Sequence, residues 1–313
     1  MVTPVVGFFG KLPWHGDFLR DVPSGAPIDL IDAWLGQGPI GPPGPHTAAF
    51  DAAGPAMVMV RARGLWWAMV LIPSKDAVGR RFPFCVMAGL PEGEFGGEPG
   101  LLPASWAPFL VRCLQQSARG WPQTQSELHT TVAALAVPVD VDSDGRRLVD
   151  ALGDHRLDEF WRGTLGSSSD QRRDAVWSDL VALAGDPSKS TGILVRPMVH
   201  QLHLSFVLML QHLIGDTGCA PVLIGLQPGR PGDAPGATVL WGRPTSAECL
   251  AALWPTMHGA DSARIHDPVK RPGAFGDPTE ALDNLGDPTV SLRDLLHEVG
   301  SSTKRYTRRP RPT

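Results

Sequence analysis

The charged side chains with the clearest potential for chemistry lie in a glycine-rich stretch near the start of the chain. Lys11, Asp17 and Arg20 are set there among aromatic residues, so they cannot all belong to a hydrophobic core. The pair Gly10-Lys11 suggests a phosphate-binding loop, but that loop needs the pattern G-x-x-x-x-G-K-[ST]. Here Leu12 replaces the hydroxyl residue, and no glycine stands five positions before Gly10. The sequence therefore argues against a phosphate loop.

The acidic run Asp140 to Gly145 (DVDSDG) is the strongest pattern for a metal ion. Its three carboxylates at alternate positions, followed by glycine, copy the first half of a calcium-binding EF-hand loop. The twelfth position of that loop should be acidic but is Ala151, and Arg146 and Arg147 would repel a cation. An Asp-Gly turn that closes a hairpin explains the same residues. We prefer the turn and keep calcium as the minor alternative.

Other catalytic or metal-binding signatures are weak. His200 and His203 could share one face of an apolar helix, but there is no H-E-x-x-H motif, and polar residues at the margin of a buried helix are the simpler interpretation. The chain contains no G-x-S-x-G motif, and no cysteine carries the local signature of a catalytic nucleophile. A triad could still assemble from distant residues. We expect no catalytic residue, no metal site and no cofactor.

The composition is that of a globular protein with a substantial core. Hydrophobic residues make up 42% of the chain and charged residues 19%, which is incompatible with intrinsic disorder. A net charge of −4 argues against nucleic acid as the main partner. Four widely spaced cysteines lie in apolar segments, so buried free thiols in a reducing compartment are expected. The sequence shows no signal peptide and no apolar run of membrane-spanning length, which predicts a cytoplasmic protein without direct membrane insertion.

The hydrophobic periodicity and the turn residues divide the chain into elements. In the first half we expect a helix over 27–35, a loop over 36–47, strands over 57–63, 65–72 and 82–88, a helix capped by Ser105, and a helix over 123–136. In the second half we expect strands over 193–195, 222–226 and 238–241, and helices over 197–214, 245–254 and 291–299. Pro138 and the acidic turn indicate a boundary near 136–140. We therefore predict an N-terminal domain over 1–137, a smaller α/β part over 138–258, and a Pro/Gly-rich extension over 259–313 with one short helix and a basic tail.

Two stretches in the first third resemble one known family. The first, GFFGKLPWHGDFLR over residues 7–20, is similar to the opening G-F-F-G-K-L-P-x-x-G-D-F of TagF, also called ImpM, an accessory protein of bacterial type VI secretion. The second follows the family pattern W-x-G-V-x-x-P-S-x-D-x-V-G-R-x-F-P-L. The matching residues are Trp67, Pro73, Ser74, Asp76, Val78, Gly79, Arg80, Phe82 and Pro83. Phe84 replaces the usual leucine and Met69 replaces a glycine.

The resemblance implies a non-enzymatic, post-translational repressor of type VI secretion. Such proteins engage a cytoplasmic forkhead-associated scaffold protein, which would be the partner here. The fold expected is a three-layer α/β arrangement, with an antiparallel-to-mixed central sheet flanked by helices as in longin or profilin-like domains, plus a smaller α/β part. The candidate partner-binding or loop-shaping residues are Lys11, Trp14, Asp17, Arg20, Ser74, Asp76 and Arg80.

Two other functions stay open. The first is a hydrolase or small-ligand enzyme with a site built from the 10–20 and 73–81 loops, where Lys11 and Asp17 would lie beside Ser74. A deep pocket at those side chains would favour it, whereas a shallow apolar patch with a charged rim would favour the regulator. The second is a structural adaptor of the secretion baseplate.

Overall fold

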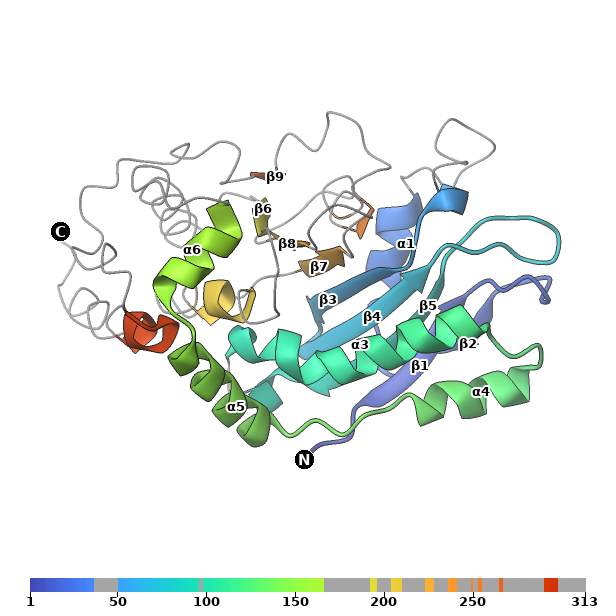
Figure 1. The fold of residues 1–313 in the computed structure, drawn as a ribbon. Helices are drawn as coiled ribbons and strands as arrows, with labels where there is room; N and C mark the ends of the chain where they lie inside the picture. The colour runs from blue at the N-terminus through green and yellow to red at the C-terminus, as the bar shows by residue number, and fades with distance from the viewer. Residues whose placement is uncertain are drawn as a thin grey trace, which may run out of the picture.

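The core of the protein is one large twisted sheet (Figure 1). The computed structural model describes residues 1–36, 50–95, 98–165, 192–195, 204–209, 223–227, 236–240, 249, 253–254, 265–266 and 290–297. The strands are β1 Val5–Gly10, β2 Leu19–Asp21, β3 Ala56–Ala62, β4 Leu65–Ile72, β5 Phe84–Pro91, β6 Gly192–Val195, β7 Leu223–Gln227, β8 Gly236–Leu240 and β9 Ile265–His266. Their order in the sheet is β2-β1-β5-β4-β3-β7-β8-β6-β9. Every pairing is antiparallel except β6 with β9, which is parallel.

The hairpin of β3 and β4 forms the centre of the sheet. Its two-residue turn, Arg63-Gly64, has positive φ angles of 54° and 76°, the backbone of the primed turns that match the twist of paired strands. Between the two strands the pairing runs from Ala62 opposite Leu65 to Ala56 opposite Leu71. All of β4 except its two ends is buried, as expected for a strand covered on both faces.

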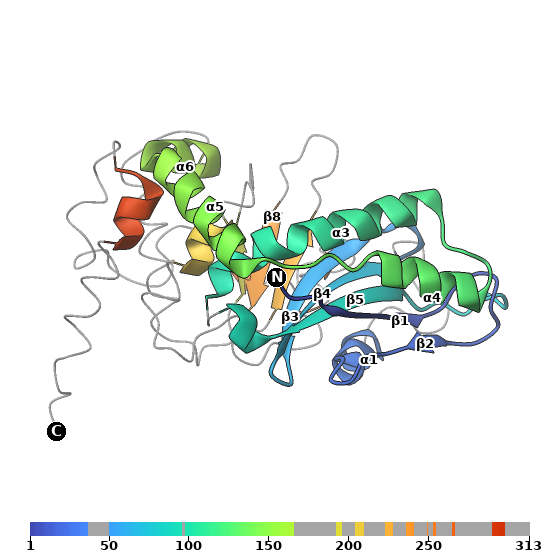
Figure 2. The ribbon, with the colours of Figure 1, turned by 90° about the horizontal axis from the view of Figure 1, so that it is seen from below.

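Helices cover both faces of the sheet. Helices α3 (Leu102–Arg119) and α4 (Gln125–Ala134) lie on one side and α1 (Ile28–Gly36) on the other, as Figure 2 shows. Alternate side chains of β4 supply the two cores: Trp66 packs in the cluster with α3 and α4, and Trp67 in the cluster with α1. This alternation is the period of an extended strand. The predicted three-layer arrangement around an antiparallel-to-mixed sheet is confirmed.

The strands of the second half extend this same sheet. β7 pairs with β3, with Met57 opposite Leu226 and Val60 opposite Leu223, and β8 and β6 follow it. Two further helices, α5 (Val141–Asp154) and α6 (Leu157–Leu165), lie between the halves along the chain. The domain limits at 137 and 258 stay predictions.

One prediction for a helix start is wrong. The helix expected to begin at Ser105 begins at Leu102, after an N-cap Leu101 that makes no side-chain capping bond. Proline at position 103 is compatible with this first turn, and Ser105 is a buried residue inside the helix. The predicted apolar face, which includes Trp106, is confirmed as buried.

The acidic run at 140–145 is the beginning of α5 and not a hairpin turn. Asp140 is the N-cap, and its Oδ1 accepts a hydrogen bond from the Ser143 amide at 3.2 Å. The first turn also holds Asp142 and Asp144, where carboxylates interact favourably with the helix dipole. Helix capping therefore explains the alternate carboxylates. Within the described ranges, no three His, Cys, Asp or Glu side chains are grouped so that they could hold a metal ion.

Most other predicted elements are confirmed where the structure describes them. The helices over 27–35 and 123–136 and the strands over 57–63, 65–72, 193–195, 222–226 and 238–241 are present with small shifts of their ends, and the strand expected from 82 begins at Phe84. Cys85 and Cys113 are buried free thiols, as predicted, and Cys249 is buried. No helix in the described part of the chain is long and apolar enough to span a membrane.

Several predictions lie outside the described residues. These are the loop over 36–47 apart from residue 36, most of the helices over 197–214 and 245–254, His200 and His203, and the basic tail. Residues 204–209 of the first of these helices are helical, as are Cys249 and Leu253 of the second. Residues 292–297 form the expected short helix, in which the Ser291 hydroxyl accepts the Asp294 amide at 3.1 Å.

Candidate functional site

The two family-like stretches meet at one end of the sheet. The first runs from the end of β1 into β2, and the second joins β4 to β5. The amide of Ala77 donates a hydrogen bond to the His15 carbonyl at 3.0 Å. The Arg80 guanidinium reaches the same loop and donates to the Gly16 carbonyl at 2.5 Å. The two loops therefore lie against each other although 64 residues separate Gly16 and Arg80.

Asp76 is the centre of this contact. Its Oδ1 accepts the amides of Val78 and Arg80 at 3.1 and 2.8 Å. Its Oδ2 accepts Lys11 Nζ at 2.9 Å and Arg80 Nε at 2.7 Å. Both Lys11 and Asp76 are buried, whereas the Arg80 side chain is 57% exposed. We call Lys11, Asp76 and Arg80 the ion cluster.

The charge on Asp76 is stabilised by its donors. Burial by itself raises the pKa of this carboxyl, but the hydrogen bond from Lys11, those from the backbone and side chain of Arg80, and the Lys11 charge together hold the pKa well below its usual value. Asp76 is therefore an anion at neutral pH that is paired with two cations. In this state it orders the two loops, because its donors come from both of them.

The second loop is a tight turn around Asp76. The amide of Gly79 donates to the Asp76 carbonyl at 3.0 Å, and the Phe82 amide donates to the Ser74 carbonyl at 3.1 Å. Gly79 has a φ of 87°, a left-handed conformation that glycine adopts without a steric penalty. The sequence S-x-D-x-V-G-R is therefore explained locally: the aspartate binds the amides and the glycine allows the reversal.

An exposed surface covers the ion cluster. The Phe18 ring stacks on Phe9 with a centroid distance of 5.3 Å and meets the edge of Phe82 at 4.9 Å. Lys11 Nζ lies 4.8 Å from the Phe18 ring centroid. Phe18 is nevertheless 40% exposed, and Val78 is 71% exposed. We call the exposed side chains of Phe18, Val78 and Arg80 the signature surface.

The remaining candidates lie around the ion cluster. Asp17 is exposed, and its Oδ1 accepts the Phe18 amide at 2.8 Å. Arg20 is on β2 opposite Phe9, and its positive charge partly offsets the effect of burial, which raises the pKa of Asp32 on α1. Asp17 and Arg20 thus lie outside the ion cluster.

The last two candidates, Trp14 and Ser74, lie in the same two stretches as the ion cluster. Trp14 is partly buried against the core with its ring edge-on to His15 at 5.5 Å. Ser74 is half-buried and contributes its backbone carbonyl to the turn.

Phe18 and Phe82 are the residues that sequence reasoning missed. Both belong to the family-like stretches, but aromatic side chains in a folded protein are by default core residues. The available signal was the position of Phe18 between two charged residues, Asp17 in the loop and Arg20 on β2. An aromatic residue flanked by charges in a loop has a reduced chance of being fully buried.

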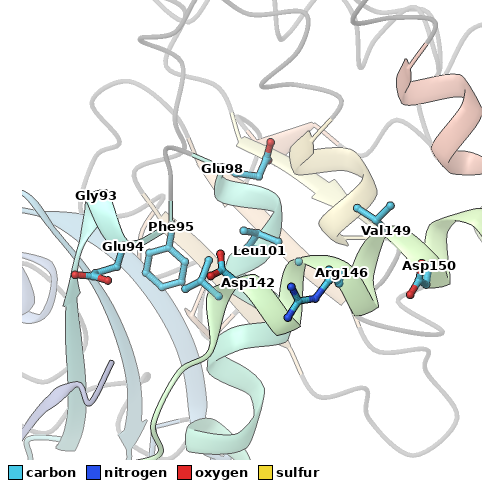
Figure 3. Close-up of a pocket in the computed structure, with 11 residues that line it drawn as sticks. Gly93, Glu94, Phe95, Glu98, Leu101, Asp142, Arg146, Val149 and Asp150 are labelled. Atoms are coloured by element: carbon cyan, nitrogen blue, oxygen red, sulfur yellow. The ribbon is translucent and has the colours of Figure 1, made fainter. Parts of the chain in front are cut away.

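A separate groove of about 640 Å³ lies between the segment 93–101 and α5. Figure 3 shows Asp142, Arg146, Val149 and Asp150 along the helix, and Glu94 and Phe95 from the other wall. This groove contains none of the candidate residues from the two family-like stretches.

Comparison with known proteins places the first part of the chain in a family. A model of the TagF N-terminal domain, described as type VI secretion system-associated, matches residues 7–135. The crystal structure of PA0076 from Pseudomonas aeruginosa PAO1 aligns at 27% identity over 33% of this chain, with a TM-score of 0.22. That alignment spans 56% of the PA0076 chain. A search of curated proteins gave no match. Both halves of the ion cluster lie inside the matched range, and residues 7–135 therefore form a TagF N-terminal domain, a domain described as type VI secretion system-associated.

Proposed function

We propose that this protein is a non-enzymatic, post-translational repressor of type VI secretion that binds a cytoplasmic forkhead-associated scaffold protein through the signature surface. One observation carries the proposal. The two stretches that resemble TagF come together in a single ion cluster, and this cluster supports an exposed surface of one aromatic, one aliphatic and one cationic side chain.

The division between buried and exposed groups supports a binding role. The ammonium of Lys11 and the carboxylate of Asp76 are buried against each other, so they are engaged in holding the loops. The side chains that remain exposed are those of Phe18, Val78 and Arg80. Aromatic residues and arginine are enriched in the well-packed centres of protein interfaces. A large aliphatic residue with 71% of its area exposed, such as Val78, gains from being covered by a partner.

Repression follows from competition. When the signature surface occupies the scaffold protein, the scaffold is withheld from assembly of the secretion apparatus until a signal releases it. The rigid loops favour this function, because little conformational entropy is lost when preordered side chains bind. The mechanism needs no chemical step and no cofactor.

The experiment measures binding between the purified full chain and the forkhead-associated scaffold of the same secretion system. Val78→Glu places a carboxylate on the signature surface, and Val111→Glu on α3 is the matched control, since Val111 is 47% exposed. We expect the first variant to bind about tenfold more weakly or worse, because an unpaired charge must be buried, and the control to bind like the unaltered chain. Type VI secretion activity should rise only in cells that carry Val78→Glu.

Two results would contradict the proposal. Equal binding by both variants would remove the signature surface from the interface. If no binding to the scaffold is detected, proteins captured by the full chain from its native host should be identified. Recovery of sheath or baseplate proteins would then favour the structural adaptor, and turnover of a small molecule that is lost in Ser74→Ala would favour the enzyme.

A further inference from the structure

The groove between the segment 93–101 and α5 has the chemistry of a site for a basic peptide. Its described lining includes four acidic residues, Glu94, Glu98, Asp142 and Asp150, and one basic residue, Arg146. The apolar part of the lining consists of Phe95, Leu101, Val141 and Val149. Phe95 is buried, whereas Val149 is 40% exposed. An occupant of this groove must therefore combine positive charges with an apolar or aromatic side chain.

The chain's most strongly basic segment fits that description. The sequence K-R-Y-T-R-R-P-R over residues 304–311 has five basic residues, no acidic residue and the chain's single tyrosine, Tyr306. A basic segment of this kind is attracted to a groove whose charged residues are mainly acidic. Tyr306 offers an aromatic ring with a polar end, which suits an apolar floor with a polar rim.

The neighbouring helix brings this segment within reach. Residues 290–292 are bonded to the junction of α5 and α6: the Leu157 amide donates to the Val290 carbonyl at 2.9 Å, and the Leu292 amide donates to the His155 carbonyl at 3.0 Å. The Arg293 side chain packs against Gly153, where an added Cβ would lie 2.8 Å from the guanidinium carbon. The helix over 292–297 therefore starts beside the C-terminal end of α5.

The chain between this helix and the basic segment is long enough to run the length of α5. Seven residues lead from His297 to Lys304, and in extended form they span about 24 Å. The 14 residues of α5 are about 21 Å long. Asp150 is less than one turn from Gly153, so the near end of the groove lies close to the point where the helix over 292–297 docks.

We propose that the groove lined by the segment 93–101 and α5 is a binding site for the chain's own basic segment 304–311. This site is distinct from the signature surface and does not depend on the proposed function. It covers the groove from within the same chain, so that an external basic peptide would have to displace it.

Photo-cross-linking of the full chain tests the proposal. A benzophenone amino acid replaces Val149 in the groove, and cross-linked peptides are identified by mass spectrometry. We expect links to residues 301–313 whose yield does not depend on protein concentration. The double variant Glu94→Lys/Asp150→Lys should lower this yield about tenfold, because two attractions become repulsions. The control Asp154→Lys changes an exposed carboxylate on the same helix outside the groove and should leave the yield unchanged.

A second variant leaves the groove intact. Replacement of Lys304, Arg305, Arg308, Arg309 and Arg311 by glutamine should also remove the link, and 1 M salt should weaken it in the unaltered chain. Absence of a link to 301–313, or a link that survives both sets of substitutions, would overturn the proposal. So would links that join light and heavy copies in an isotopically mixed sample, because the occupant would then be a second copy of the chain.

Discussion

Phe18→Ala tests whether the signature surface is held by the contacts described above. The ring stacks on Phe9, meets the edge of Phe82 and covers the Lys11 ammonium. Removing a fully buried phenylalanine costs about 3–5 kcal/mol. Because Phe18 is 40% exposed, scaling this cost by the buried fraction gives a loss of about 2–3 kcal/mol, to which the cation–π contact contributes about 0.5–1 kcal/mol.

The free energy of unfolding is measured by urea denaturation at pH 7, with the same slope required for both proteins. Phe18→Leu keeps most of the apolar contact and loses the ring interactions, so its loss should be about 1 kcal/mol. Val78→Ala is the exposed control and should change stability by less than about 0.5 kcal/mol. A loss below about 0.5 kcal/mol for Phe18→Ala would refute the reasoning, because the ring would then contribute nothing to the ordering of the loop.

Three further predictions concern the buried groups. The pKa of Asp76 in the folded protein lies below its value of 3.8 in the unfolded chain. The contribution of the Asp76 carboxylate to stability is therefore complete above pH 3.8 and is lost as the pH falls from 3.8 toward the folded pKa. Urea unfolding at pH 3 and pH 7 should show a smaller acid-induced loss of unfolding free energy in Asp76→Asn than in the unaltered protein. Gly89→Ala should cost about 1–3 kcal/mol, because the new Cβ would lie 2.7–2.8 Å from three ring atoms of Trp67; an unchanged thermal midpoint would show that the ring can move aside. Burial raises the pKa of both the Cys85 and Cys113 thiols, that of Cys113 to about 12. Neither thiol should therefore react with iodoacetamide at pH 8 until denaturant is added. Rapid labelling of the folded protein, detected by mass spectrometry, would contradict the burial.

The sequence was informative for several strands and turns whose pattern is local. The apolar run over 65–72, the turn at Gly64 and the pairing of adjacent strands follow from periodicity and turn chemistry. The pairing of β3 with β7 could not be predicted in this way, because no local signal links residues that lie more than 160 positions apart. The start of α5 was missed because alternate aspartates satisfy both a metal loop and a helix N-terminus, and spacing alone does not distinguish them.

The candidate site was predictable in its charges and not in its surface. The two family-like stretches pointed to Lys11, Asp76 and Arg80, and the structure brings these three together. Which of them is buried depends on how the loops pack, and the sequence does not contain that information. Phe18 illustrates the same limit, since only the packing shows that its ring is shared between an aromatic cluster and the surface.

The pairing of β3 with β7 also affects how the protein is made. The match to the TagF N-terminal domain ends at residue 135, yet the outer edge of β3 is completed only by residues 223–226. At about 5–20 residues per second, a ribosome needs roughly 8–32 s to synthesise the chain between Val60 on β3 and Leu223 on β7. During that interval the amides and carbonyls of Met57 to Val60 form an open sheet edge, which can pair with another nascent chain. Ribosome-bound chaperones that cover this edge, or a slower release of the first half from the exit tunnel, would then raise the yield of folded protein.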